Sequence, residues 1–383
     1  MDFDLSDEQR LLKESVTSLI EKEYAFERRK AYAREAPGYS EARWAQYAEL
    51  GLLGLPFAEE LGGVGGTPVE TMIVMEAFGR GLVLEPYLAT VVLGGGLLRL
   101  AGSAAQRQEL IPKIAAGRLR LAFAHTERQS RYDLADVATT AKPVASGFVL
   151  SGQKGVVLHG EGADRIIVSA RTAGGPREAA GISLFLVDPK QAGVSVQGYP
   201  TVDGLRAAEI TLRDVRLDKN ALLGEQDRAL PVIERAVDLA IAALAAEAVG
   251  AMAVMHELTV EYLKTRKQFG VAIGSFQALQ HRAVDMLVAL EQARSMEYLA
   301  AMMAEAEDSG ERRRTIAAAK VQCGRSGRYV GQQAIQLHGG IGMTEEYKVG
   351  HCFKRVSMID TMFGDADHHL AAVAEAGGLI DPI

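Results

Sequence analysis

The stretch Ala334–Glu346 has the clearest capacity for ligand chemistry in this sequence. It follows a helix-like run and places three glycines in four positions, at Gly339, Gly340 and Gly342. Glycine permits a positive φ and lets backbone N–H groups approach a ligand closely. Neighbouring amides in such a turn form a concave anion site. Because the same pattern also fits an ordinary helix stop, the interpretation needs support from elsewhere in the chain.

A second stretch supplies that support. Arg266–Gly270 carries an arginine and an aromatic ring, and Ser275, Phe276 and Gln277 follow it closely. Arginine presents a planar fork of donors that suits phosphate oxygens, and the glutamines add further polar contacts. Together the two stretches indicate a site for a cofactor that carries a pyrophosphate.

Composition indicates a globular protein with more than one domain. The chain has 383 residues, of which 48% are hydrophobic and 24% are charged. Its net charge of −7 disfavours nucleic acid as a partner, because nucleic-acid binding needs a basic face. Two cysteines, Cys323 and Cys352, give no disulfide framework and fit a reducing compartment. The acidic N-terminus has no signal-peptide pattern, so we expect a cytoplasmic protein.

Two other features are better explained by structure than by chemistry. The most apolar run, Ala236–Met255, is broken by Asp238 and Glu247, so we interpret it as a buried helix and expect no membrane span. The adjacent His368 and His369 lack the spacing that metal ligands usually show. We therefore expect no metal site.

The elements that must position these residues change in type along the chain. Helical signals dominate residues 1–118, where Ser6–Gln9 forms a capping-box pattern and Thr67–Glu70 a helix start with proline at the first position. Short β-rich runs between turn residues predict a small antiparallel β domain over 119–218. Long Ala- and Leu-rich runs over 219–383 predict a helical bundle that oligomerises through broad apolar faces. The β-rich runs are 148–150, 155–158, 165–169, 181–187 and 210–212, and the long helical runs are 230–263, 276–307 and 315–336.

Six motifs resemble those of the acyl-CoA dehydrogenases, in the same order and over essentially the whole chain. They are 48–63, Leu121–Glu127, Leu150–Lys154, Thr265–Gly270, Phe276–Ala278 and Gln336–Glu346. The resemblance implies a mainly α protein with a central β domain. Its parts would be an N-terminal helical bundle, a small β-barrel or sandwich, and a C-terminal four-helix bundle.

The resemblance also implies a reaction. A glutamate removes the pro-R α-proton of an acyl-CoA thioester, and the β-hydrogen leaves as hydride to flavin N5, which gives a trans-2-enoyl-CoA. Two hydrogen bonds to the thioester oxygen would stabilise the developing enolate. Burial can raise the pKa of a carboxylate base toward neutrality. The family passes its electrons to an electron-transfer flavoprotein.

In this family the FAD lies across a dimer interface, with its adenosine diphosphate end held partly by the neighbouring subunit. The positions that match the neighbour's share are Arg266, Phe269, Gln277, Gln336, Gly339 and Gly340. Phe123 and Thr126 match contacts to the FAD from the β domain, and Asp238 matches a contact to CoA. The resemblance thus implies FAD as the cofactor and acyl-CoA as the substrate.

The flavin-ring half of the site departs from the family pattern. A run of small residues, Pro-Gly-x-Gly-Ser-Asp, is replaced by the bulky and charged Arg128–Asp133. The strand Trp-Ile-Thr, which backs the flavin ring, is replaced by Val156–Leu158. The flavin would therefore lose an aromatic wall and a polar contact.

The catalytic base is missing at both family positions. One position corresponds to Phe363 or Gly364, depending on the alignment, and the other corresponds to Ala240. Two nearby carboxylates are candidates for a displaced base. Glu247 lies two turns beyond Ala240 on the same helix face, and Asp365 follows Gly364.

Three interpretations follow from these departures. We favour a base-deficient partner subunit that lends its phosphate-binding residues to the flavin of a catalytic chain, as in an α2β2 heterotetramer. The second is a self-sufficient homotetrameric enzyme with a displaced base. The third is a flavin-free scaffold that keeps the fold for association only.

Overall fold

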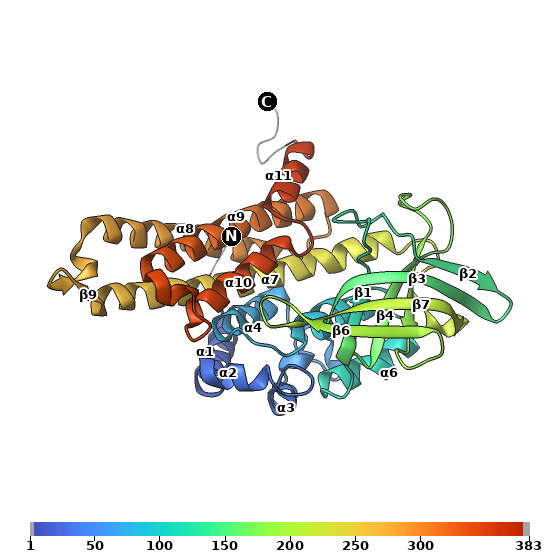
Figure 1. The fold of residues 1–383 in the computed structure, drawn as a ribbon. Helices are drawn as coiled ribbons and strands as arrows, with labels where there is room; N and C mark the ends of the chain where they lie inside the picture. The colour runs from blue at the N-terminus through green and yellow to red at the C-terminus, as the bar shows by residue number, and fades with distance from the viewer. Residues whose placement is uncertain (1–3, 378–383) are drawn as a thin grey trace. The chain divides into compact units, whose positions relative to one another are not determined.

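The computed structural model describes residues 4–377, and its fold is shown in Figure 1. Contacts within the chain divide it into two compact units. The first, which we call the helical unit, comprises the described parts of Met1–Tyr32, Pro68–Val83 and Ile241–Ile383. The second, the mixed unit, comprises Ala33–Thr67 and Leu84–Ala240. The expected fold class, mainly helical with a β domain in the middle of the chain, is confirmed.

Long helices form the helical unit, and a short hairpin lies between two of them in sequence. Its elements are α1 (Asp7–Glu23), α2 (Phe26–Tyr32), α4 (Pro68–Gly81), most of α7 (Leu230–Thr265), β9 (Lys267–Gln268), β10 (Val271–Ala272), η6 (Ile273–Ser275), α8 (Gln277–Met303), α9 (Ser309–His338), η7 (Gly339–Met343), α10 (Lys348–Thr361) and α11 (Ala366–Glu375). Helices α8, α9 and α10 pack as neighbours (Figure 1).

Helix starts in this unit follow the sequence signals. Gln9 N–H donates to the Ser6 hydroxyl at 3.2 Å, and Ser6 N–H donates to the Gln9 side chain at 3.0 Å. This reciprocal capping box satisfies two donors that the first turn of α1 would otherwise leave open. Helix α4 begins at Pro68, as the sequence predicts.

Helices α4 and α7 approach each other closely through two glycines. A Cβ atom added at Gly79 of α4 would overlap the carbonyl oxygen of Glu247 on α7. A Cβ atom added at Gly250 of α7 would in turn overlap the carbonyl oxygen of Glu76 on α4. The two backbones are therefore in direct contact, which only glycine permits.

Helix α7 is the one helix of the described residues that is long and apolar enough to cross a membrane. Its most apolar window has a mean hydropathy of 1.9 and is completely buried inside the protein. The sequence-based interpretation of this run as a buried helix agrees with that burial.

The mixed unit combines short helices with a single large sheet. Its elements are α3 (Glu41–Glu49), η1 (Leu52–Gly54), η2 (Glu59–Leu61), the π-helix η3 (Leu88–Gly95), α5 (Gly96–Ala101), α6 (Ala104–Ala115), β1 (Leu121–Ala124), β2 (Thr140–Val144), β3 (Gly147–Leu158), η4 (Gly160–Gly162), β4 (Arg165–Arg171), β5 (Ile182–Val187), β6 (Val194–Pro200), β7 (Arg206–Asp218), η5 (Lys219–Ala221), β8 (Leu222–Leu223) and the start of α7. The strand order is β6-β7-β3-β2-β4-β5-β8, and β1 pairs with β4.

The sheet corrects one sequence-based expectation, because it is mixed and not purely antiparallel. Strand β1 pairs with β4 in parallel, with Leu121 opposite Arg165, and β2 also meets β4 in parallel. The spacing of β-rich runs reports strands but not which strand each one pairs with, so the parallel pairs were invisible in the sequence. The runs 148–150 and 155–158 belong to one strand, β3, which is interrupted by a bulge between Lys154 and Val157.

Candidate functional site

The six residues predicted to hold the diphosphate end of FAD are all exposed. Phe269 is 92% exposed, which is unusual for a large aromatic side chain. All six lie in the helical unit, at the end of α7, on the β9–β10 hairpin and at the ends of α8 and α9. They are Arg266, Phe269, Gln277, Gln336, Gly339 and Gly340. An exposed set with this chemistry is suited to a ligand that a second chain also contacts.

His338 lies directly before the glycine turn and is held by aromatic packing and a hydrogen bond. Its ring packs between Tyr262, at a centroid distance of 4.6 Å, and Tyr347, at 5.0 Å. Its Nδ1 lies 2.8 Å from the Ala334 carbonyl oxygen, and burial lowers the pKa of His338, which favours the neutral ring. Tyr262 lies one helical turn before Arg266, so the glycine turn lies beside the end of α7.

The backbone beyond His338 is open to a ligand. Gly339 has a φ of 63°, which favours glycine, and a Cβ atom at Gly339 or Gly340 would have no protein atom within 4 Å. The β9–β10 hairpin places Phe269 at its turn, with the ring edge-on to Phe276 at 6.1 Å. These residues fit the diphosphate end of FAD, since an arginine, exposed glutamines and glycine backbone without side chains border open space. The Gly339 N–H itself donates to the carbonyl oxygens of Gln336 and Ile335.

The β-domain candidates present less to a ligand. Phe123 on β1 is buried and stacks on His125 at a centroid distance of 5.4 Å. Thr126 follows β1 and is exposed, so its hydroxyl is accessible. Burial lowers the pKa of His125 to about 3, and its Nδ1 lies 2.9 Å from the Ser169 hydroxyl. His125 is therefore a neutral, internally bonded group.

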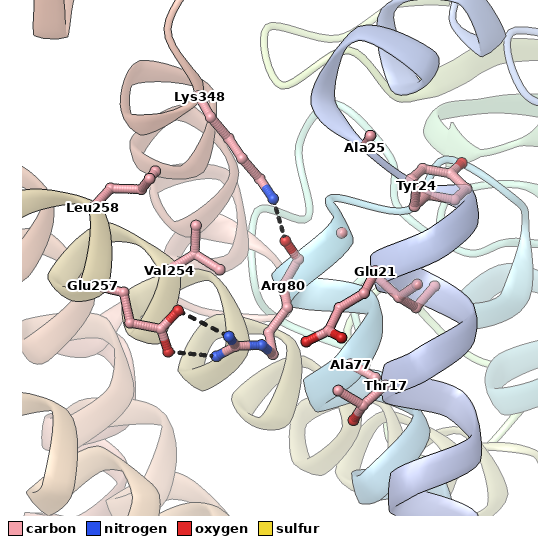
Figure 2. A pocket seen from close by; sticks show the side chains of 12 residues that line it. Thr17, Glu21, Tyr24, Ala25, Ala77, Arg80, Val254, Glu257, Leu258 and Lys348 are labelled. Atoms are coloured by element: carbon pink, nitrogen blue, oxygen red, sulfur yellow. Dashed lines mark hydrogen bonds and ion pairs between the residues drawn. The ribbon is translucent and has the colours of Figure 1, made fainter. Parts of the chain in front are cut away.

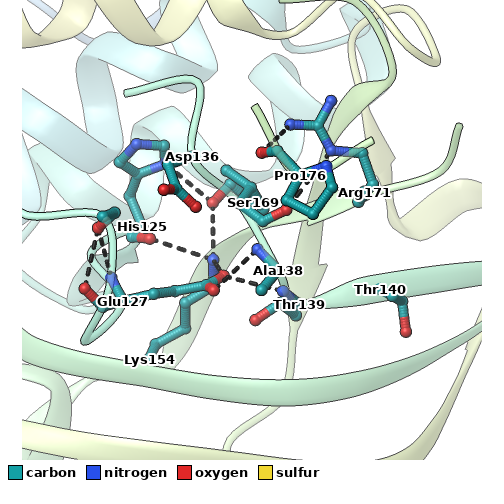
Figure 3. A network of polar contacts seen from close by, with 12 residues as sticks. His125, Glu127, Asp136, Ala138, Thr139, Thr140, Lys154, Ser169, Arg171 and Pro176 are labelled. Atoms are coloured by element: carbon teal, nitrogen blue, oxygen red, sulfur yellow. Dashed lines mark hydrogen bonds and ion pairs between the residues drawn. The ribbon is translucent and has the colours of Figure 1, made fainter. Parts of the chain in front are cut away.

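A buried ion pair occupies the centre of the β domain (Figure 3). The Lys154 ammonium is completely buried and donates to Glu127 Oε1 at 2.6 Å. It also donates to the His125 carbonyl oxygen at 3.1 Å and to the Ser169 hydroxyl at 3.0 Å. The Glu127 carboxylate further accepts the backbone N–H of Thr139 at 3.0 Å. Lys154 and Glu127 lie in motifs that the sequence shows, but no sequence signal predicts that they pair.

The pair is electrostatically closed. Burial lowers the pKa of Lys154 to about 8, although Glu127 opposes the shift. Burial acts to raise the pKa of Glu127, but Lys154 and the hydrogen bonds outweigh it and hold the pKa at about 2. The two charges neutralise each other in the ion pair. Neither group is therefore available to accept a proton from a substrate.

The two segments that replace the family's flavin contacts do not form a flat surface for a flavin ring. Val156 lies at the bulge of β3 with a φ of 51°, and it is 50% exposed. Ser130 folds back on Glu127, whose N–H donates to the Ser130 hydroxyl at 3.0 Å. Arg131 also has a positive φ of 46°. This half presents an aliphatic side chain and charged groups where the family has an aromatic ring and small residues.

The loop at one base position is held tightly without a carboxylate there. Lys320 donates to the carbonyl oxygens of Ile359 at 2.6 Å and Asp360 at 2.8 Å. The His369 Nε2 lies 2.9 Å from the carbonyl oxygen of Phe363. Gly364 has a φ of 108°, and a Cβ atom there would collide with the rings of His368 and His369. A side chain at position 364 therefore does not fit this loop.

The other base position is Ala240 on α7, whose methyl side chain is completely buried. Asp238, the candidate CoA contact, lies on the same helix and is 6% exposed. At this position too the chain offers no carboxylate.

Both candidates for a displaced base have other partners. Glu247 accepts two hydrogen bonds from Arg355, at 2.5 Å from Nε and 2.6 Å from Nη2, and both side chains are 6% exposed. Asp365 caps α11 and accepts the backbone N–H of His368 at 2.9 Å. The partner of Glu247, Arg355, carries no sequence signal that would have identified it.

Comparison with protein families gives matches along nearly the whole chain. Residues 6–118 match the acyl-CoA dehydrogenase N-terminal domain, residues 122–219 the middle domain, and residues 230–378 the C-terminal domain. A probable acyl-CoA dehydrogenase of Bacillus subtilis, YngJ, is 29% identical over 98% of this chain and 99% of its own length. CarC, a subunit of the caffeyl-CoA reductase–Etf complex of Acetobacterium woodii, is 30% identical over 80% of this chain and 82% of its own.

Solved structures of the same fold accompany these relatives. A chain of a variant of the Tcur3481–Tcur3483 steroid ACAD has a TM-score of 0.87 and 29% identity, and the match covers 97% of each chain. The FAD complex of PigA has a TM-score of 0.89 and 26% identity, with 99% of this chain and 100% of the other covered.

Proposed function

Because this chain belongs to the acyl-CoA dehydrogenase family, which consists of oxidoreductases with FAD as their cofactor, we propose that it is a base-deficient partner subunit. In this role it completes the FAD site of a second, catalytic subunit within an α2β2 assembly. The reaction of the assembly is α,β-dehydrogenation of an acyl-CoA to a trans-2-enoyl-CoA.

One observation carries the proposal. The set of residues predicted to bind the diphosphate, which includes Arg266, Gln336 and Gly340, is exposed, and every family position in it is filled. In contrast, Ala240, Phe363 and Gly364 place no carboxylate at either base position. A chain that keeps the contacts made to a neighbour's cofactor and lacks the group that starts the chemistry is suited to serving a neighbour.

The residues of this chain act in the proposed assembly by binding and orienting. Arg266 pairs with the diphosphate, and Gly339 and Gly340, which carry no side chain, let it approach the backbone of the turn closely. The Gly339 N–H stays bonded to the carbonyl oxygens of Gln336 and Ile335. The Gln277 and Gln336 side chains add hydrogen bonds, and Phe269 covers the bound group. FAD, once bound, supplies the hydride acceptor, while the base belongs to the catalytic subunit.

The run Met358–His369 supports a finer assignment, because it resembles the small subunit of pimeloyl-CoA dehydrogenase. We therefore propose a medium-chain or dicarboxylic acyl-CoA as the substrate of the assembly and an electron-transfer flavoprotein as its electron acceptor. The Tcur3481–Tcur3483 enzyme, whose name joins two designations, and CarC, named as a subunit of a complex with Etf, support the search for such partners.

Purification of the chain alone and with a co-expressed family member tests the proposal. We expect the chain alone to hold little FAD and to give no loss of flavin absorbance when pimeloyl-CoA is added under anaerobic conditions. The co-purified assembly should hold FAD, and pimeloyl-CoA should reduce that FAD. Arg266→Ala together with Gln336→Ala should then lower its FAD content, while the control Arg228→Ala, at a 79% exposed side chain, should not. A chain that is yellow and reduced on its own would refute the proposal.

The displaced-base alternative has a separate test. Glu247 is held by two hydrogen bonds from buried Arg355, and a base must be free to accept a proton. We expect Glu247→Gln to lower stability and leave the kcat of the assembly nearly unchanged. A loss of several hundredfold in kcat, with FAD content retained, would identify Glu247 as the base. If none of these variants changes the flavin content or the turnover of the assembly, the chain is better described as a flavin-free scaffold.

A further inference from the structure

A cavity of about 240 Å³ lies within the helical unit, and its lining shares no residue with the FAD-binding set (Figure 2). Helices α1, α4, α7 and α10 all contribute to its wall. The residues are Thr17, Ile20, Glu21, Tyr24, Ala25, Ala77, Arg80, Gly81, Val254, Glu257, Leu258 and Lys348. The cavity therefore has an apolar side and a charged side.

The charged side is organised around Lys348. Its ammonium group donates to the carbonyl oxygen of Arg80 at 2.6 Å, and this is its one hydrogen-bond acceptor among the described residues. An ammonium group has three donors, so two donors of a largely buried lysine remain for a ligand. Lys348 is also the first residue of α10, whose N-cap residue Tyr347 gives no side-chain cap within the described part of the chain. The positive end of the helix therefore adds to the field at this point.

The surroundings of Lys348 favour an anion. Arg80 is paired with Glu257 through two hydrogen bonds, at 2.9 and 2.8 Å, so its charge is already balanced. Burial lowers the pKa of Lys348; Cys352 acts to raise it, the nearby cations Arg80 and Arg29 act to lower it, and Glu257 opposes those cations. Glu21 is exposed at the cavity and lies in the field of Arg80. An anion beside Lys348 would accept hydrogen bonds from its two remaining donors and favour the charged form of the ammonium group.

The apolar side limits the rest of the ligand. Ile20 and Val254 are buried, and Leu258 is half-buried beside them. A cavity of about 240 Å³ is smaller than the range that accepts drug-sized molecules. An anion with a short aliphatic tail matches the volume of the cavity and its division into a charged side and an apolar side.

We propose that this cavity binds a short-chain carboxylate, with its head on Lys348 and its tail against Ile20, Val254 and Leu258. The site does not depend on the proposed partner role, because it is complete within one chain. A bound carboxylate would join α10 to α1 and α4, and it would stabilise the helical unit by mass action.

Isothermal titration calorimetry of the purified chain with butyrate tests the proposal. Acetate supplies the head without most of the tail, n-butanol supplies the tail without the charge, and inorganic phosphate supplies an anion without a tail. We expect butyrate to bind, acetate to bind more weakly, and butanol and phosphate to bind least. Lys348→Met should weaken butyrate binding about tenfold or more, because a hydrogen bond between charged groups is lost.

Matched variants make the result specific. Lys354→Met on the same helix is the control, because Lys354 pairs with Glu345 and is not part of the cavity. It should leave butyrate binding unchanged. Leu258→Gln should weaken butyrate more than acetate. The absence of butyrate binding at about 50 mM, or equal binding by the Lys348→Met variant, would overturn the proposal, and phosphate binding as tightly as butyrate would refute the carboxylate assignment.

Discussion

The glycine turn at Gly339–Gly340 and the polar centre around Lys154 use polar groups in opposite ways. The turn leaves its backbone open, with no protein atom within 4 Å of either added Cβ atom. At the polar centre, each of the three donors of Lys154 has an acceptor within 3.1 Å. One region borders open space, and the other satisfies its polar groups within the chain.

The difference separates two kinds of motif. Buried charges must be paired within the chain, because leaving one unpaired is costly. Gly339 also serves the fold, because it ends α9 and its N–H bonds back to the helix. The exposed Gly340 and Arg266 have no such internal reason for their arrangement. A family motif that survives at an exposed position is therefore better evidence of ligand binding than one that survives inside the fold. Lys154→Met and Gly340→Val test this contrast directly, while Glu297→Gln tests a buried group without a hydrogen-bond partner among the described residues and Val156→Gly tests a strained exposed one.

The largest effect is expected from Lys154→Met, which leaves the Glu127 carboxylate buried without a counter-charge. We expect a loss of about 3–5 kcal/mol in the free energy of unfolding, measured by urea denaturation of the purified chain. Lys142→Met, at an exposed lysine on the neighbouring strand β2, is the matched control and should cost little. The double variant Lys154→Met/Glu127→Gln should recover part of the loss. If Lys154→Met costs no more than the control, the polar centre does not hold the β domain together.

A second substitution concerns a buried carboxyl group that the helical unit does not pair. Glu297 on α8 is completely buried, and neither carboxyl oxygen has a hydrogen-bond partner among the described residues. Burial raises the pKa of Glu297 well above 4.5, and the nearby carboxylate of Glu76 raises it further. The folded chain therefore keeps a proton that the unfolded chain releases above pH 4.5, so stability falls as the pH rises above that value.

Glu297→Gln removes this dependence because the amide does not ionise. We expect the variant to be more stable than the natural chain by about 2 kcal/mol at pH 8, with a smaller difference at pH 5. Urea unfolding at both pH values measures the effect, and Glu291→Gln on the exposed face of α8 is the control. A constant difference between the two pH values would show that Glu297 does not titrate as described.

The glycine turn is tested by Gly340→Val, which should affect the ligand and not the fold. A branched side chain would occupy the space in front of the amides, so we expect the FAD content of the co-purified assembly to fall about tenfold. The melting temperature should stay within about 2 °C, because the substitution meets no protein atom. Gly162→Val, at a glycine with equally open surroundings, is the matched control and should leave FAD unchanged. A Gly340→Val assembly with full FAD content would exclude the turn from the cofactor site.

The smallest effect is expected at the bulge of β3. Val156 has a φ of 51°, a conformation that costs a β-branched residue about 1 kcal/mol. Val156→Gly should therefore stabilise the chain by about 1 kcal/mol in urea unfolding. Val144→Gly, at a partly exposed valine of β2, should destabilise it, since glycine weakens a regular strand. If both substitutions destabilise the chain, the bulge is not strained.

Local signals in the sequence predicted much of the fold. Helix starts at Ser6 and Pro68 are marked by residues that bond to their own backbone within one turn or that begin a helix readily, and both are confirmed. Within α3, Trp44 is buried, whereas Leu50, an equally apolar residue, is 49% exposed because it is the C-cap residue. Local patterns thus specify where an element begins better than which way its last residue faces.

Long-range partners were beyond the reach of these signals. The parallel pair β1–β4, the Glu247–Arg355 ion pair and the cavity at Lys348 join residues that lie far apart in sequence. The residue types at the predicted FAD-binding positions could be identified from the sequence, because each of the motifs that contain them is a short contiguous stretch. The assignment of those positions to FAD contacts stays a prediction, and so do the weaker contacts at Phe123, Thr126 and Asp238.

The reciprocal glycines of α4 and α7 have a consequence for how this sequence can change over time. Gly79 and Gly250 carry no functional group, yet each fills the only space that the opposing backbone leaves. In a scan of all single substitutions, even alanine at either position should be tolerated as poorly as a change at the Lys154–Glu127 pair. Positions that never contact a ligand would then rank among the most constrained in the chain, and a ranking by tolerance alone would mistake them for a binding site.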